Sequence, residues 1–373
     1  MAHLTTLGQL ITPAPIVKCG EGSYPVLSMT MRDGIVLQSD RFKKSLASTD
    51  QSNYKVVKLG QLVVGFPIDE GVLYVQKVID EGIMSPAYNV WNINTNLVNA
   101  DYLELALHSP YAMDYYKSKL RGTTARRRTL PTRELLALPL PLPDFETQAE
   151  IVANIRKATE LIALRKEQLA KLDQLVKSRF VELFENKYNT IKIGDVFKTT
   201  SGGTPSKAHP EYYEGGTIPW LSSGEVNAGV ISSVKNCITQ AGVDNSSAKM
   251  VPENSVVIAM YGATAGQVGL LRIATTTNQA VCSVLPNNSY VPEYLYYAVK
   301  SKKDWMISQC AGGAQPNISQ GIIRKMEIID APLEKQEQFA TFVEQTDKSK
   351  LAIQQSLDKL EFLKKSLMQE YFG

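Results

Sequence analysis

The sequence has few of the residues from which metal and disulfide sites are built. Its 373 residues include only three histidines and four cysteines. No histidine is spaced as a metal-binding pair with another histidine or a cysteine, and no CxxC motif occurs. The cysteines are far apart, which argues against a disulfide framework and favours reduced, structural thiols. These residues are His3, His108, His209, Cys19, Cys237, Cys282 and Cys310.

Long apolar segments are also absent. The chain has no unbroken apolar run near the ~20 residues that a membrane helix needs, and no amino-terminal charged segment followed by an apolar one. We therefore expect neither secretion nor membrane insertion, and a cytoplasmic location. The net charge is only +3, so a nucleic-acid-binding surface would have to be a local concentration of positive charge.

The motifs of a self-sufficient DNA methyltransferase or ATPase are missing. No glycine-rich cofactor loop follows a predicted strand, and no [Asn/Asp]-Pro-Pro-[Tyr/Phe] element occurs. The nearest candidates for a GxxxxGK[ST] phosphate-binding loop, GGTPSK and GATAGQ, have the wrong spacing. We expect no catalytic site, no metal and no cofactor in this chain.

The chain contains an internal repeat. With an offset of 188 positions, residues 121–184 align without a gap with residues 309–372. Upstream, residues 54–64 resemble residues 248–258. The identical pairs include Glu146 with Glu334, Gln148 with Gln336, Lys171 with Lys359 and Phe184 with Phe372. Two similar units in one chain suit a partner that is itself two-fold, such as duplex DNA or a pair of identical subunits.

Each repeat is predicted to be a β-rich globule followed by a long helix. Short β-branched runs such as GIVLQ, YKVVKL, QLVVGF and NSVVIAMYG, separated by turn residues, indicate strands. Prolines at 139, 141, 143 and 332 break the chain ahead of each helix. We expect a first globule over 1–143, a helix over 144–186, a second globule over 187–332 and a helix over 333–373.

The two helices have the pattern of a coiled-coil seam. In the first, apolar residues recur at alternating spacings of four and three, with Arg165 and Arg179 as exceptions. The second has a weaker seam, with Thr346, Lys350 and Lys364 in three of the slots. The predicted fold is α+β: two β-rich domains, each followed by a long helix, with the helices packed as an antiparallel coiled coil. Two separate surface helices are the alternative, which the shared length and offset disfavour.

A series of phrases in the second globule resembles one known family. In order, they are SGGTPS, EYYEGGTIPWLSSGEV, AKMVPENSVVIAMYGATAGQVG, TNQAV, EYLYY, GGAQPNIS and APLEKQ. Together they resemble a target-recognition domain of the specificity subunit of a Type I restriction-modification enzyme. The first globule is similar more loosely, through NADYLELAL and RRRTLPTRELLALPLPLPDFETQ.

The resemblance implies that each globule reads one half of a split double-stranded DNA target. It implies that the helices set the distance between the halves and dock two methyltransferase subunits, through which restriction and translocase subunits join the complex. The subunit itself has no activity in that family, so S-adenosylmethionine, ATP and magnesium would belong to the partners.

The first globule offers basic candidates for DNA contact. The cluster RGTTARRR contains Arg121, Arg126, Arg127 and Arg128, whose guanidinium groups can bind phosphates or guanine. A solvated cluster that neutralises another acidic face is the alternative. Phosphate contacts are also expected from Arg41, Lys43 and Lys44 in SDRFKKS, unless these charges guard a strand edge.

The second globule offers polar candidates. In the repeat, Gln315 and Asn317 take the places of Arg127 and Thr129, and paired amide hydrogen bonds can read adenine. A loop whose amides satisfy their own backbone is the alternative there. Further candidates, for each of which a purely structural role is equally open, are Ser201, Thr204, Ser206, Lys207, Ser222, Ser223, Glu225, Tyr261 and Thr264.

Two other functional classes stay open from the sequence. A scaffold protein could use the duplicated helices to assemble two partners without reading DNA sequence. A stand-alone enzyme is disfavoured by the missing motifs. Low affinity for every DNA probe in the presence of a methyltransferase partner would favour the scaffold.

Overall fold

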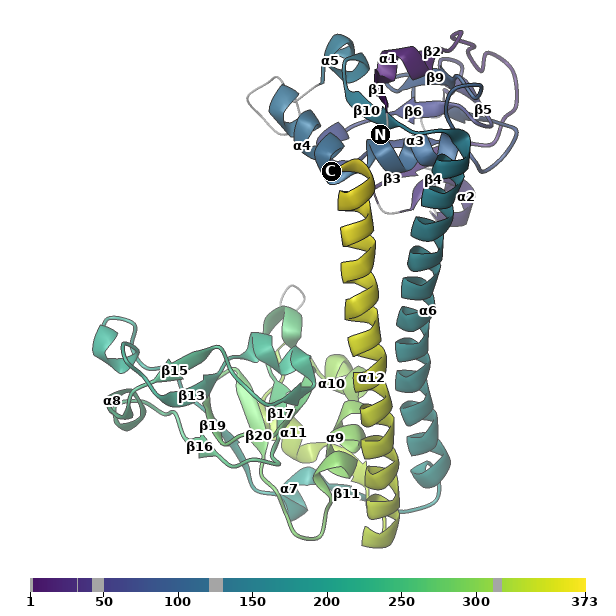
Figure 1. Cartoon of the computed structure of the whole chain (residues 1–373). Coiled ribbons are helices and arrows are strands. Elements are labelled where there is room, and N and C mark those ends of the chain that lie inside the picture. Colours follow the sequence, from purple (N-terminus) through teal and green to yellow (C-terminus); the bar gives the residue numbers. More distant parts are fainter. Residues whose placement is uncertain (1–2, 32, 42–49, 121–129, 311–316) are drawn as a thin grey trace. The chain divides into compact units, whose positions relative to one another are not determined.

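The computed structural model describes residues 3–31, 33–41, 50–120, 130–310 and 317–373. The chain forms two compact units: unit 1 is Met1–Lys166 with Gln355–Gly373, and unit 2 is Glu167–Gln354. Each unit contains one β-rich region and a part of both long helices, α6(Phe145–Phe184) and α12(Leu333–Phe372) (Figure 1). No helix in the described ranges is both long and apolar enough to span a bilayer.

Unit 1 is built from short strands and short helices. Its strands are β1(His3–Thr6), β2(Ile11–Pro13), β3(Leu27–Thr30), β4(Gly34–Leu37), β5(Lys55–Lys58), β6(Leu62–Val64), β7(Leu73–Val75), β8(Glu81–Met84), β9(Asn89–Ile93) and β10(Pro139–Leu142). Its helices besides α6 and α12 are α1(Leu7–Leu10), α2(Gln38–Arg41), η1(Ile68–Glu70), α3(Ala100–Leu107), α4(Pro110–Lys119) and α5(Thr132–Leu136).

Unit 2 has a larger β region. Its strands are β11(Thr190–Lys192), β12(Thr199–Ser201), β13(Ile218–Leu221), β14(Val230–Ile231), β15(Asn236–Ile238), β16(Met250–Val251), β17(Val256–Ala259), β18(Val268–Leu271), β19(Thr275–Thr277), β20(Val281–Val284) and β21(Glu327–Ile329). Its short helices are α7(Ile193–Val196), η3(Pro210–Tyr212), η4(Ser223–Ala228), α8(Gln240–Asp244), η5(Gly262–Thr264), α9(Pro292–Lys300), α10(Lys303–Ser308) and α11(Gln320–Lys325).

The sequence repeat extends into the pairing of the strands. Unit 1 has the antiparallel order β2-β9-β6-β7, and unit 2 has the antiparallel order β12-β20-β17-β18 with β14 added. The pair β5-β8 has its counterpart in β16-β19, and β1-β10 in β11-β21. Both units therefore contain the same arrangement of strands at their centre.

Two local expectations are corrected. The proline-rich segment before α6 does not only break the chain: it forms β10 and pairs with β1. A strand in a two-stranded sheet has a free edge, where proline's missing N–H costs no hydrogen bond. The sequence also predicts one helical segment over 101–120 and one over 292–309 ahead of the long helices. In the structure each is divided in two, as α3 and α4 and as α9 and α10, and Pro110 begins α4.

The long helices begin and end where local chemistry permits. Pro143 precedes α6, and the Asp144 carboxylate accepts a hydrogen bond from Thr147 N at 2.8 Å, which caps the first turn and lowers the pKa of Asp144. After α6, Asn186 adopts a left-handed conformation with φ 58°. Every position of the predicted seam on both helices is buried or half-buried, including Arg165, Lys350 and Lys364.

Each long helix is joined to its unit by a buried glutamine. Gln148 accepts a hydrogen bond from Asn99 N at 2.7 Å and donates one to Pro143 O at 2.8 Å. Gln336 accepts from Val291 N at 2.8 Å and donates to Ala331 O at 2.8 Å. Asn99 and Val291 are the residues that precede α3 and α9. Both repeats therefore contain the same pair of hydrogen bonds from a buried glutamine side chain to backbone groups near the start of the long helix.

Aromatic residues at the helix ends enter the cores. In unit 2, Phe184 of α6 is fully buried against Tyr294, with ring centroids 4.8 Å apart. In unit 1, Phe372 of α12 lies against Tyr102, with centroids 5.3 Å apart. Phe184 and Phe372 are repeat equivalents. The end of each repeat's helix therefore completes the core of the unit that contains the other repeat's β region.

Candidate nucleic-acid interface

The ends of several strands in unit 2 meet in one group of loops, which we call the loop rim: residues 202–207, 222–228, 260–267 and 278–280. Backbone hydrogen bonds of 2.8 to 3.0 Å connect these loops to each other and to the strands: Gly203 N to Thr277 O, Asn278 N to Leu221 O and Met260 N to Ala280 O. Residues distant in sequence are therefore neighbours on a single surface.

The glycines of SGGTPS hold the first loop against the sheet. A Cβ at Gly202 would collide with the carbonyl oxygen of Thr277, so only glycine allows the loop to lie so close to β19. Trp220, half-buried, donates from its indole nitrogen to Gly203 O at 3.1 Å. These contacts fix the base of the loop and leave its tip to carry the polar side chains.

Three of the four candidates in this loop are exposed. Thr204 donates a hydrogen bond to the side chain of Gln279 on the neighbouring loop. Ser206 and Lys207 are exposed, and no ion pair joins Lys207 to another described residue. Ser201 differs, since it is half-buried in β12 and paired with β20.

The candidates after β13 form an internal clasp. Glu225 accepts hydrogen bonds from Ser222 Oγ at 2.8 Å and from Lys235 N at 2.8 Å. Partial burial opposes ionisation of the carboxyl, but these hydrogen bonds outweigh it and lower the pKa of Glu225. Most of its acceptor capacity is therefore used inside the loop. Ser223 is half-buried as the first residue of η4.

The structure brings Tyr261 and Asn317 together. They form an isolated antiparallel bridge, although 56 positions separate them in the sequence. Tyr261 is 40% exposed, and Asn317 is exposed. Thr264 donates to Tyr261 O at 3.2 Å and so stabilises the turn. Because this backbone bridge joins exposed Asn317 to the 260–267 loop, we include Asn317 in the loop rim.

Most basic candidates fall outside the described residues. These are Lys43, Lys44, Arg121, Arg126, Arg127 and Arg128, together with Gln315 of the second globule. Arg41 is described: it ends α2 and forms an ion pair with Asp33.

Gln279 is a rim residue that sequence reasoning missed. Its side chain is exposed and meets Thr204 across two loops. The phrase TNQAV was available as a signal, but its position beside SGGTPS depends on the β19-to-β20 connection, which sequence spacing does not reveal. Among the described residues, no group of three or more His, Cys, Asp or Glu side chains is arranged to hold a metal.

Comparison with known proteins identifies similar chains. Residues 185–361 match the family described as Type I restriction modification DNA specificity domain. The chain is 27% identical over 207 residues to the EcoR124I/EcoR124II specificity subunit of Escherichia coli, covering 52% of this chain and 50% of that protein. It is 22% identical to the HindI specificity subunit of Haemophilus influenzae, covering 74% and 77%. The chain thus spans half the length of its Escherichia coli relative.

Solved structures share the fold. One, from work on complex assembly and conformational transition of the type I R-M system, superposes with a TM-score of 0.64 at 17% identity, covering 99% of this chain and 97% of that one. Another, a Type-I restriction-modification system S subunit from M. genitalium, gives a TM-score of 0.55 at 14% identity, covering 100% and 96%. At these identities the likeness concerns the fold alone.

Proposed function

We propose that the chain is the DNA-recognition subunit of a Type I restriction-modification complex, on the premise of its similarity to the specificity domain and specificity subunits of that family. Each unit would bind one half of an asymmetric, bipartite target. The observation that carries this proposal is the repeated strand order, which gives one chain two equivalent but chemically different loop surfaces. Duplex DNA offers two half-sites of matching symmetry.

The proposed contact surface of unit 2 is the loop rim. Exposed Lys207 suits a phosphate, while Ser206, Tyr261 and Asn317 can donate to or accept from base edges. Glu225 is assigned a supporting role, because its carboxylate is engaged by its own loop. In unit 1 we keep the arginines at 121 and 126–128, with Arg41, Lys43 and Lys44, as proposed phosphate contacts.

We propose that the helices form an antiparallel coiled coil that spaces the half-sites. Contacts inside each unit support it. In unit 1, Lys166 and Glu361 form an ion pair at 2.8 Å, and in unit 2 Lys350 and Asp173 form one at 2.7 Å. A second contact in each unit gives the direction: Asn154 donates to Tyr371 Oη at 3.2 Å in unit 1, and the Arg179 guanidinium lies 5.9 Å from the Phe342 ring centroid in unit 2. Within each unit, residues further along α6 therefore contact residues earlier in α12. The domain division at 1–143, 144–186, 187–332 and 333–373 is part of this proposal.

The proposed partners are two methyltransferase subunits and, through them, restriction subunits. Catalysis would reside in these partners, in the cytoplasm, where they act on cellular DNA. The chain itself would then recognise the DNA sequence and bind the catalytic subunits.

Exchange of one recognition surface tests the proposal. Residues 187–330 would be replaced by the matching segment of a related subunit, and the methylated motif mapped in cells that also contain the methyltransferase partner. One half of the motif should change and the other should persist. Changes in both halves of the motif would refute the proposal that each unit reads its own half-site. If neither parent complex bound any DNA probe, the scaffold function would be favoured instead.

A further inference from the structure

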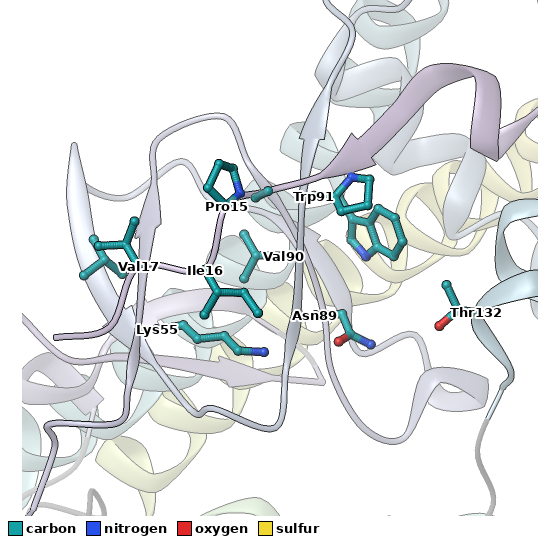
Figure 2. Close-up of a pocket in the computed structure, with 11 residues that line it drawn as sticks. Pro15, Ile16, Val17, Lys55, Asn89, Val90, Trp91 and Thr132 are labelled. Carbon is teal, nitrogen blue, oxygen red and sulfur yellow. The ribbon is translucent and has the colours of Figure 1, made fainter.

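One end of the central sheet of unit 1 is the counterpart of the loop rim. Strands β2, β9, β6 and β7 correspond to β12, β20, β17 and β18. At this end, the chain that follows β2 lines a cavity of about 200 Å³ together with Asn89, the first residue of β9 (Figure 2). Asn89 is paired with Val64, the last residue of β6, so the loop after β6 lies at the same end of the sheet.

The loop after β6, residues 65–72, matches the rim loop that follows β17. Gly65 N donates to Val72 O at 2.8 Å and closes this loop. In unit 2, Ala259 N donates to Gln267 O at 2.9 Å in the same way. Each loop contains one short 3₁₀ turn, η1 in unit 1 and η5 in unit 2. The conformation of loop 65–72 therefore shapes the surface of unit 1 that is equivalent to the rim.

His108 joins this loop to the end of α3. Its Nε2 lies 3.0 Å from the carbonyl oxygen of Gly71, the residue that follows η1. Its Nδ1 lies 2.8 Å from the carbonyl oxygen of Glu104 in the last turn of α3. A carbonyl oxygen can only accept a hydrogen bond, and a neutral imidazole has a hydrogen on just one of its nitrogens. Both contacts can be hydrogen bonds only when the ring is the cationic imidazolium.

The backbone and the aromatic ring beside His108 suit a cation. The last carbonyl groups of a helix carry partial negative charge, and Glu104 O is one of them in α3. The Tyr74 ring of β7 lies against the imidazole, with centroids 4.9 Å apart, which permits a cation–π contact. Burial raises the pKa of Tyr74, so its phenol group stays neutral.

The charged groups around His108 are mainly carboxylates. In α3, the Glu104 carboxylate accepts from Val75 N at 2.7 Å and forms an ion pair with Lys77 at 3.3 Å. The turn η1 contributes the carboxylates of Asp69 and Glu70. The side chain that α4 places beside Gly71 is the neutral Met113. An imidazolium would therefore meet more negative than positive charge here.

The repeat places a cationic side-chain type at the same position in unit 2. The segments DYLELALHS and EYLYYAVKS align His108 with Lys300. Lys300 ends α9, donates to Tyr296 Oη at 2.8 Å and lies 4.9 Å from the centroid of that ring. Both units thus have a basic residue against an aromatic ring at the end of this helix. Histidine is the side-chain type that gains or loses its charge between about pH 5 and 8.

We propose that His108 is a positioning residue of unit 1: its imidazolium fixes loop 65–72, and loss of the proton releases the loop and weakens DNA binding. A neutral ring would present a nitrogen lone pair to one of the two carbonyl oxygens, so one contact must break. The Glu104 contact stays within one helix end, whereas Gly71 belongs to the loop, so the loop is the part that is released. The effect on DNA binding rests on the proposed function, but the contact between ring and loop does not.

The pH dependence of DNA affinity tests the proposal in the complex with the methyltransferase partner. H108K keeps a charge that does not titrate near neutrality, and H108Q lacks one. At constant ionic strength, the wild type should match H108K near about pH 6 and H108Q near about pH 8.5, with affinity falling about tenfold between them. H3Q is the control, because exposed His3 lies in β1 and does not contact the loop, and it should keep the wild-type profile. The wild-type profile in H108K or H108Q would overturn the proposal.

Nuclear magnetic resonance of the nitrogen-15-histidine-labelled full chain tests the contact without DNA. The chain has three histidines, and H108Q identifies the signals of His108. Near about pH 6, two ring N–H signals of His108 should be visible, because hydrogen bonds slow their exchange with water, and one should vanish as pH rises. Exposed His3 should give none. A single protected ring N–H from His108 near pH 6 would overturn the proposal.

Hydrogen exchange in the free chain separates this proposal from the proposed function. At one fixed pH near 6, the Gly71 and Val72 amides should lose protection in H108Q and keep it in H108K. If these results hold but the complex binds no DNA at any pH, the proposed function is rejected and the His108 contact stands. If the complex binds DNA and the amides stay protected in H108Q, the His108 proposal is rejected and the proposed function stands.

Discussion

Several residues whose side chains could serve a function instead stabilise the fold. Gln148 and Gln336 are identical in the repeat because each satisfies two buried backbone groups at the start of a long helix. Glu225 has a carboxylate that could accept from cytosine, and Ser222 a hydroxyl that could contact a base edge, yet their hydrogen bonds hold η4 in place. Residue type alone cannot separate these roles, since the same oxygen atoms accept from a base or from a neighbouring amide.

The Glu225 clasp gives a prediction about pH. Because the folded pKa of Glu225 lies below its ordinary value of 4.5, its contribution to stability is present above that value and is lost as pH falls through the folded pKa. Glu225→Gln should lower the urea midpoint at neutral pH, since an amide N–H₂ would face a backbone N–H. The gap from wild type should narrow below about pH 4.5. Exposed Glu253→Gln is the control, and a pH-independent gap would contradict the clasp.

At the scale of elements, the sequence predicts where helices and strands form better than it predicts which of them are in contact. Uninterrupted periodicity predicts α6, because no Pro or Gly occurs between 145 and 184. GIVLQ, YKVVKL and QLVVGF form β4, β5 and β6. The pairing of β1 with β10 was not predictable, because more than 130 residues separate the two strands and prolines conceal the second. Likewise, the Tyr261–Asn317 bridge depends on a fold-wide arrangement that no local pattern encodes.

The aromatic helix ends give a prediction about which unit each end stabilises. Phe372 comes from the second repeat, but its ring packs on Tyr102 of α3 in unit 1. Phe372→Ala should therefore cost about 3 to 5 kcal/mol of stability in unit 1. Hydrogen exchange should show lost protection in α3 and unchanged protection in α9.

Phe362→Ala is the matched control, since Phe362 lies on the same helix but is 72% exposed. Loss of protection in α9 instead of α3 would show that the helix end supports its own repeat.

At the scale of the whole molecule, the repeat predicts a rule for spacing. If the helices hold the two recognition surfaces apart, one matched heptad inserted after Leu169 and after Leu357 preserves the seam and lengthens each helix by roughly 10 Å. With a rise of ~3.4 Å per base pair, the unread spacer between half-sites should grow by about three base pairs. The half-site sequences should stay the same, since neither recognition surface is altered.

Mapping of methylated sites in cells that carry the lengthened chain and its methyltransferase partner measures both quantities. A heptad in α6 alone is the control, because it shifts one side of the proposed seam without the other and should reduce stability and methylation instead of giving a new spacer. Rotation of one half-site about the duplex axis is expected to lower affinity in the matched variant, so the readout is the motif and not the rate. An active matched variant that keeps the original spacer would show that elements other than α6 and α12 set the distance.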